Sequence, residues 1–210
     1  MCFSAGASFV TSGALAATGA AAIQKTKKLR LIAFTPVLFA IQQFSEGLQW
    51  IVRGQGALGG ALGYFFLFFA FLLWPVYVPL AVLESETSKK KRQYLRFLIL
   101  AGILTSTYFL FVLLTNPLIM RFHTYGIEYA FNVHQLFVGF IFYATVIFGS
   151  LFISSRSSIR RFGILILISA VFSLIFFLQT FISVWCFFAA VISLYIYFAI
   201  LKGGRTGKKQ

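Results

Sequence analysis

The chain has 210 residues, of which 60% are hydrophobic and only 10% are charged. A soluble domain of this size needs more charge to cover its surface, so this composition excludes an ordinary soluble protein. A membrane-spanning helix needs about 20 apolar residues, and residues 1–210 are therefore predicted to form a single transmembrane domain. The net charge of +14 lies in short runs between apolar stretches. That distribution predicts anionic phospholipids as partners and argues against nucleic acid.

Seven apolar stretches follow one another along the chain, and they predict an all-α bundle of seven transmembrane helices. Their approximate ranges are 6–23, 31–52, 61–83, 97–115, 129–153, 162–179 and 182–201. The last two form one apolar run about twice the length that spans a bilayer, so we divide it at its most polar point, 179–183. The range 202–210 remains as a basic tail.

The basic residues predict the orientation of the bundle. Sixteen of the 18 follow the first, third, fifth and seventh stretches, and only Arg53 and Arg121 fall on the other side. The positive-inside rule then places the N-terminus outside and the C-terminus in the cytoplasm. Because its charges come after it, the first stretch is predicted to be an uncleaved anchor.

Two features predict how the helices pack. A stripe of small residues lets a second helix approach the first stretch closely. The stripe consists of Ser8, Ser12, Ala16 and Ala20. In the third stretch, Pro75 and Pro79 predict a bend near Trp74. Neighbouring helices would provide hydrogen-bond partners for the backbone groups that the prolines leave unpaired. The outer segment 117–127 is amphiphilic and is predicted to lie at the membrane interface.

Polar side chains within the stretches collect at one predicted depth, near the outer face. Gln42, Glu46 and Gln49 have the spacing i, i+4, i+7 of one helical face. The same spacing recurs in the fifth stretch at Glu128, Asn132 and Gln135. Because lipid cannot satisfy such groups, we expect an intramembrane polar cavity, open to the outer side, that binds a small ligand or a metal ion. Its expected lining is Gln42, Glu46, Gln49, Trp50, Asn132, His134, Gln135 and Trp185.

Four residues near the outer face carry the candidate chemistry: Cys2, Glu46, His134 and Cys186. A carboxyl group at the depth of Glu46 should be neutral, paired or metal-bound, and its alternative role is to join helices within a glutamine network. Three interpretations of the cysteines stay open. They are a disulfide, a copper, zinc or iron site completed by Glu46 and His134, and an N-terminal nucleophile at Cys2 after removal of Met1. Closure of the helix ring would bring the first and last stretches together, and Cys2 near Cys186.

The inventory of acids and bases excludes several classes of enzyme and cofactor. The chain has no aspartate, which excludes a Ser-His-Asp triad. No lysine lies within any stretch, which excludes a retinal Schiff base. His123 is interpreted as an ordinary surface residue, so paired axial histidines for a haem are missing. A sensor, carrier or metal-handling protein is therefore expected ahead of a membrane-embedded enzyme.

Three segments resemble one known family. The chain opens with Met1-Cys2-Phe3-Ser4-Ala5, and the segments 43–50 (QFSEGLQW) and 183–188 (SVWCFF) follow later. Together they resemble a family of uncharacterised bacterial multi-pass membrane proteins whose members begin with this string. The resemblance implies a location in the bacterial inner membrane and implies no activity.

Overall fold

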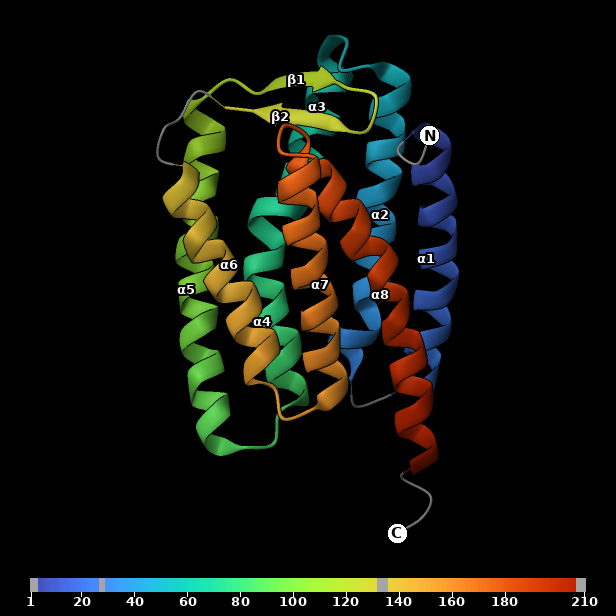
Figure 1. The fold of residues 1–210 in the computed structure, drawn as a ribbon, viewed down its shortest axis with the longest axis vertical. Helices are drawn as coiled ribbons and strands as arrows, with labels where there is room; N and C mark the ends of the chain where they lie inside the picture. The colour runs from blue at the N-terminus through green and yellow to red at the C-terminus, as the bar shows by residue number, and fades with distance from the viewer. Residues whose placement is uncertain (1–3, 27–28, 132–135, 207–210) are drawn as a thin grey trace.

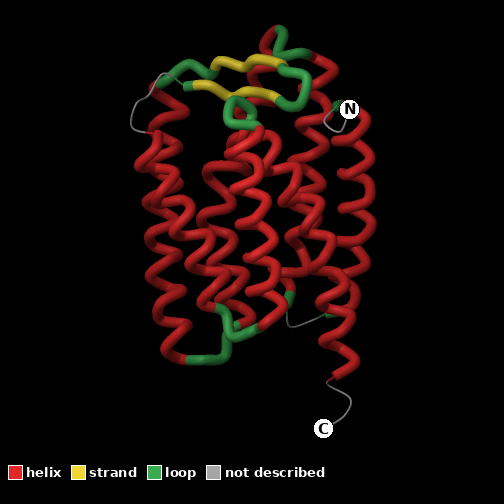
Figure 2. The backbone as a smooth tube through the Cα atoms, viewed as in Figure 1, coloured by secondary structure: helices red, strands yellow, loops and turns green. Residues whose placement is uncertain are grey.

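The computed structural model describes residues 4–26, 29–131 and 136–206, which form a bundle of roughly parallel helices (Figure 1). A two-stranded antiparallel β-hairpin lies across one end of the bundle, drawn in yellow in Figure 2. The elements are α1 (Ala5–Lys25), α2 (Arg30–Val52), α3 (Gly56–Leu67), the π-helix η1 (Phe68–Leu73), α4 (Trp74–Ser85), α5 (Lys89–Thr115), β1 (Ile119–Phe122), β2 (Ile127–Ala130), α6 (Leu136–Ile153), α7 (Ser157–Phe176) and α8 (Phe181–Thr206). The predicted all-α class therefore describes the bundle, to which the hairpin is an addition.

Six helices in the described ranges are long and apolar enough to cross a membrane. They are α1, α2, the continuous segment Gly56–Ser85, α5, α7 and α8. A seventh, Phe137–Ile153, is apolar but shorter. The predicted division of the last apolar run is confirmed, because α7 ends at Phe176 and α8 begins at Phe181.

The fifth predicted stretch, 129–153, is wrong at its beginning. Residues Ile127–Ala130 form strand β2, in which burial alternates from one residue to the next. A strand buries every second residue, whereas a helical face recurs every three to four residues. Glu128 therefore does not lie on a helical face with Asn132 and Gln135, and the latter two lie outside the described residues.

Helix α1 packs against both α2 and α8, which confirms the predicted contact between the first and last stretches (Figure 1). Its buried face is formed by Ser8, Ser12, Leu15, Gly19 and Ala22. The predicted small-residue stripe is thus wrong in its second half, because Ala16 and Ala20 are exposed. A helix has 3.6 residues per turn, so a strict four-residue spacing drifts off the contact face. The close approach occurs at Gly19, where a Cβ would lie 2.6 Å from Cγ2 of Val37.

The proline-containing helix is irregular one turn before the predicted position. The π-helix η1 directly precedes Trp74 and Pro75, and Pro79 lies further along in α4. A proline lacks the N–H that would pair with the carbonyl four residues earlier, so Pro79 frees the carbonyl of Pro75. Helix α5 packs against that carbonyl at Gly102, where a Cβ would lie only 2.1 Å from the oxygen. Ser106 of α5 also donates to the Leu72 carbonyl at 2.8 Å.

We call the end that carries the β-hairpin the hairpin end, and the opposite end, with the turns 86–88 and 154–156, the basic end. At the basic end the carboxylate of Glu84 accepts hydrogen bonds from the backbone N–H groups of Arg30 and Leu31, at 3.2 and 2.9 Å. These bonds satisfy free N–H groups at the start of α2. Lys25 donates to the Tyr197 hydroxyl at 2.9 Å and joins α1 to α8 at the same end.

Glu86 connects two turns at the basic end. Its carboxylate accepts hydrogen bonds from the backbone N–H groups of Thr87 and Ser88 at 2.9 Å, and of Ser155 at 2.7 Å. Burial alone would raise the pKa of Glu86, but the hydrogen bonds from Ser88, Ser155 and Thr87 outweigh it and lower the pKa from 4.5 to about 2. The turn before α5 is thereby held against the turn before α7.

Candidate functional site

The predicted polar face of α2 is buried inside the bundle. Gln42, Gln43 and Gln49 are fully buried, and Glu46 is 2% exposed. The Glu46 carboxyl group accepts hydrogen bonds from Gln43 Nε2, at 3.1 Å, and from the Ser183 hydroxyl of α8. The Ser183 oxygen in turn accepts the backbone N–H of Ile127 at 3.3 Å. Glu46 thus links α2 to α8 and, through Ser183, to strand β2.

Gln49 extends these contacts toward α3 and the hairpin. Its Nε2 donates to the Leu62 carbonyl at 3.0 Å, and its Oε1 accepts from the Tyr129 hydroxyl at 2.8 Å. The Tyr129 ring stacks on Phe66, with centroids 4.9 Å apart and planes at 7°. Burial raises the pKa of Tyr129 well above its usual value, so the hydroxyl keeps the proton that it donates.

Gln42 carries the contacts toward the middle of the bundle, where its Oε1 accepts from Trp74 Nε1 at 3.1 Å. We call the whole set the polar network, and its members are Gln42, Gln43, Glu46, Gln49, Trp74, Tyr129 and Ser183. The polar network joins α2, α4, α8 and the hairpin. Helical spacing predicted three of its four α2 members, Gln42, Glu46 and Gln49. It missed the partners on other elements, because those contacts are tertiary.

The hairpin, which contacts the polar network through Ile127 and Tyr129, also contains charged contacts of its own. Glu128 pairs with Arg121 at 2.9 Å and with the His123 ring at 2.7 Å. His123, which we expected to be an ordinary surface residue, lies partly exposed in the hairpin loop and contacts Glu128 there. Trp50, expected at the rim of the cavity, packs edge-on against Phe122 of β1 at 5.7 Å.

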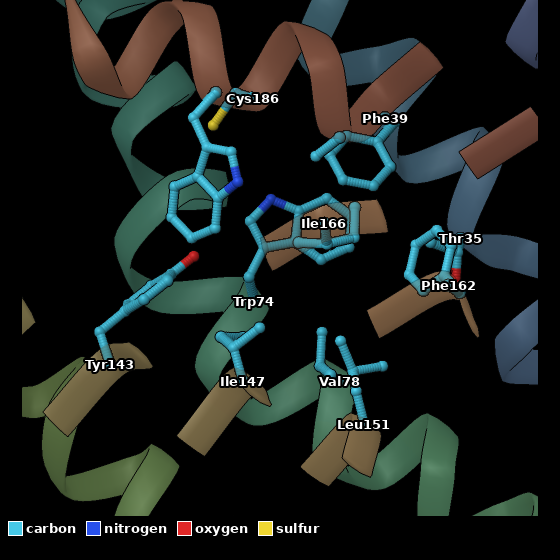
Figure 3. A pocket seen from close by; sticks show the side chains of 12 residues that line it. Thr35, Phe39, Trp74, Val78, Tyr143, Ile147, Leu151, Phe162, Ile166 and Cys186 are labelled. Carbon is cyan, nitrogen blue, oxygen red and sulfur yellow. The ribbon is translucent and has the colours of Figure 1, made fainter. Parts of the chain in front are cut away.

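A pocket lies between the helices next to Trp74, a member of the polar network (Figure 3). The empty space between its lining atoms is about 480 Å³, with the open solvent at its mouth included. Five helices, α2, α4, α6, α7 and α8, contribute its lining: Thr35, Phe39, Trp74, Val78, Tyr143, Ile147, Leu151, Phe162, Ile166, Trp185, Cys186 and Ala189. None of these twelve described residues is charged. The pocket is therefore apolar, and the Glu46 carboxyl group is not part of its lining.

Two polar atoms at the pocket have no partner within the described part of the chain. Trp185 Nε1 is buried and makes no hydrogen bond. The Tyr143 hydroxyl makes none either, and Figure 3 shows it on the side of the ring that faces Trp74 and Cys186. Gln42, whose Oε1 accepts from Trp74, also has a buried Nε2 without a partner. Nothing in the sequence distinguishes Tyr143 from the other tyrosines, so its place in the pocket was missed.

Apart from Trp50, which packs on the hairpin, the described site residues that we predicted fall into two groups. Gln42, Glu46 and Gln49 belong to the polar network, whereas Trp185 and Cys186 line the pocket. The two groups meet at α8, where Ser183 lies one turn before Cys186. Cys2, Asn132, His134 and Gln135 lie outside the described residues.

The described residues hold no group of three or more histidine, cysteine, aspartate or glutamate side chains that could hold a metal ion. Of the four candidate ligands only Glu46 and Cys186 are described, and Cys186 is a buried thiol. Its disulfide with Cys2 and the shared metal site therefore stay predictions.

Comparison with known proteins places the chain in a family without assigning it an activity. No curated protein and no solved structure matches it. A family model described as a family of unknown function matches residues 1–209, nearly the whole chain. The chain belongs to this family of unknown function, DUF6629.

Proposed function

We propose that this integral membrane protein binds a small, mostly apolar molecule in the pocket, as a carrier or sensor rather than as an enzyme. The observation that carries the proposal is the unpartnered Nε1 of Trp185 at an apolar pocket between five helices. A buried donor without a partner costs free energy, about 1–3 kcal/mol. A ligand with a hydrogen-bond acceptor would recover that cost on binding.

The polar network supports the pocket in a different way. Both oxygens of Glu46 and both polar atoms of Gln49 have hydrogen-bond partners within the protein. A group whose bonds are already made gains little from a ligand. We therefore assign the polar network the role of holding the hairpin across the bundle, next to the pocket.

The proposed orientation has the hairpin end outside and the basic end in the cytoplasm of a bacterium, within the inner membrane. It is supported by the excess of lysine and arginine at the basic end. The basic end would then lie against anionic phospholipid headgroups. A reporter that is active only in the cytoplasm, fused after Gln210, should be active. Activity of a periplasmic reporter at the same position would overturn the orientation.

The binding proposal is tested by filling the pocket. Ala189 is buried and lines the pocket, so Ala189→Phe should displace a bound molecule. The measurement is native mass spectrometry of protein purified from its own membranes. The matched control is Ala16→Phe, the same change at an exposed position of α1. Ile147→Phe, on another pocket wall, repeats the test if Ala189→Phe fails to fold.

The expected result is a small molecule that stays with the wild type and with Ala16→Phe but is lost from the pocket-filling variants. If the pocket-filling variants retain the molecule, the pocket is not its binding site. If the wild type carries no molecule, there is no bound ligand to explain. Either result would remove the proposal.

A metal site is the second candidate, and one contact favours it. Ser183 donates to Glu46, and Cys186 lies one turn further along α8, so a carboxyl group and a thiol sit near each other inside the bundle. Elemental analysis of the purified protein should then find stoichiometric copper, zinc or iron, which Cys186→Ser removes. A metal content below one tenth of the protein would end this candidate.

A further inference from the structure

The unused hydrogen-bonding groups at the pocket restrict what it can bind. An indole N–H can only donate, so Trp185 Nε1 requires an acceptor on the ligand. Two other lining residues already use their donors: Trp74 Nε1 donates to Gln42, and the Thr35 hydroxyl donates to the Leu31 carbonyl at 3.3 Å. The Tyr143 hydroxyl is the second free group and can also donate. The ligand therefore has to bring acceptors.

The aromatic walls of the pocket are held in fixed orientations. Trp74 stacks on Phe39, with ring centroids 4.1 Å apart and planes at 26°. Trp185 stacks on Phe181, with ring centroids 5.3 Å apart and planes at 24°. Tyr143 packs edge-on against Trp185, with centroids 5.9 Å apart. Rings stacked in this way cannot rotate freely to follow a flexible chain. The walls favour a flat ligand that stacks on them.

Charge sets the third restriction. None of the twelve described lining residues is charged, and burying an unpaired ion in such surroundings costs several kcal/mol or more. A carboxylate, a phosphate or an ammonium group is excluded from the pocket by this argument. The ligand is neutral.

We propose that the pocket binds a neutral, flat molecule with a carbonyl group, of the quinone or aromatic ketone class, whose carbonyl oxygen accepts from Trp185 Nε1. This inference rests on the proposed function of the pocket and adds the chemical class of the ligand. Trp74 and Trp185 both line the pocket and offer faces on which the ring can stack, and the Tyr143 hydroxyl is placed to donate to a carbonyl as well.

Two probes of nearly equal shape test the class. Duroquinone (tetramethyl-1,4-benzoquinone) carries two carbonyl groups, and durene (1,2,4,5-tetramethylbenzene) is its counterpart without them. The full chain in lipid nanodiscs is titrated with each, and binding is measured as the excess over empty nanodiscs. Duroquinone should bind about tenfold more tightly than durene, since one good hydrogen bond in an apolar site has about that value.

Trp185→Phe removes the donor and keeps an aromatic ring. It should weaken duroquinone binding about tenfold and leave durene binding within roughly twofold. Tyr143→Phe should weaken duroquinone binding by a smaller factor. The matched control is Trp50→Phe, the same substitution at the hairpin end, which should change neither affinity.

Three results would overturn the inference: durene binding as tightly as duroquinone, Trp185→Phe weakening both equally, or no duroquinone binding above empty nanodiscs. The pocket-filling variants separate this failure from failure of the proposed function. A native molecule that Ala189→Phe displaces, but that has no carbonyl group, would remove the inference and leave the function in place. If Ala189→Phe loses no bound molecule relative to the wild type, both the inference and the proposed function are wrong.

Discussion

The carboxyl groups at the two ends of the bundle have hydrogen-bond partners, whereas two aromatic side chains that line the pocket have polar atoms without one among the described residues. At the hairpin end Glu46 accepts from Gln43 and Ser183, and at the basic end Glu86 accepts three backbone N–H groups. In the middle, Trp185 Nε1 and the Tyr143 hydroxyl have no partner in the described residues.

This difference indicates that a cluster of polar residues inside a membrane bundle need not be the binding site of the protein. The carboxyl groups at the ends are engaged and connect helices, turns and the hairpin. The unused donors that line the pocket belong to aromatic residues, Trp185 and Tyr143. Four substitutions test whether the ends stabilise the fold while the middle binds.

The largest effect is expected for Glu46→Ala. It leaves the Ser183 hydroxyl and the Gln43 amide without their acceptor in a buried site, so the free energy of unfolding should fall by about 3 kcal/mol. Chemical denaturation in detergent measures the change. Glu46→Gln, which keeps one acceptor oxygen, should lose about half as much. If Glu46→Ala is as stable as the wild type, Glu46 does not stabilise the fold and is free for another role.

Glu86 should give a somewhat smaller effect with a defined pH dependence. Its pKa is about 2 in the folded protein and 4.5 ordinarily, so it stabilises the fold above about pH 4.5, and that contribution is lost as the pH falls toward 2. Glu86→Gln should lower the free energy of unfolding at pH 7 by about 2 kcal/mol. The variant should also have a flatter stability curve than the wild type between these pH values. If stability falls equally with pH in Glu86→Gln and in the wild type, Glu86 is not the source of this pH dependence.

Tyr129→Phe removes one hydroxyl from the polar network. Gln49 Oε1 loses its donor while the ring can still stack on Phe66, so a loss of about 1 kcal/mol in the free energy of unfolding is expected. Thermal unfolding in detergent provides the measurement. A loss no greater than that of an exposed Tyr125→Phe control would show that the hydrogen bond contributes nothing.

The smallest effect on stability is expected for Tyr143→Phe, the same chemical change in the pocket. Its hydroxyl has no partner in the described residues, so the free energy of unfolding should change by less than about 0.5 kcal/mol. Ligand affinity, by contrast, should fall. Equal losses of stability for Tyr129→Phe and Tyr143→Phe would erase the distinction between the end and the middle of the bundle.

The helices could be predicted from sequence because hydropathy and basic residues repeat along the whole chain. The spacing of Gln42, Glu46 and Gln49 also predicted a buried face of α2, which the structure contains. Both signals are local: they depend on residues within one helix and on the loops next to it.

The hairpin and the pocket could not be predicted, since each depends on segments far apart in sequence. Strand β2 has four residues and precedes a long apolar helix, so its two-residue alternation was read as part of that helix. Ser183 becomes part of the polar network only because α8 packs beside α2. The pocket collects side chains from five helices, and no spacing along any one of them indicates its shape.

The pairing of Arg121 with Glu128 on the hairpin has a consequence for insertion into the membrane. In the proposed orientation the hairpin crosses the bilayer during biogenesis, against a potential that opposes outward movement of cations. That work is about 2.3 kcal/mol per charge at 100 mV. Because one arginine and one glutamate pair on the hairpin, their charges cancel and the potential does no net work on the pair. Arg53 is then the one arginine whose transfer the membrane voltage resists.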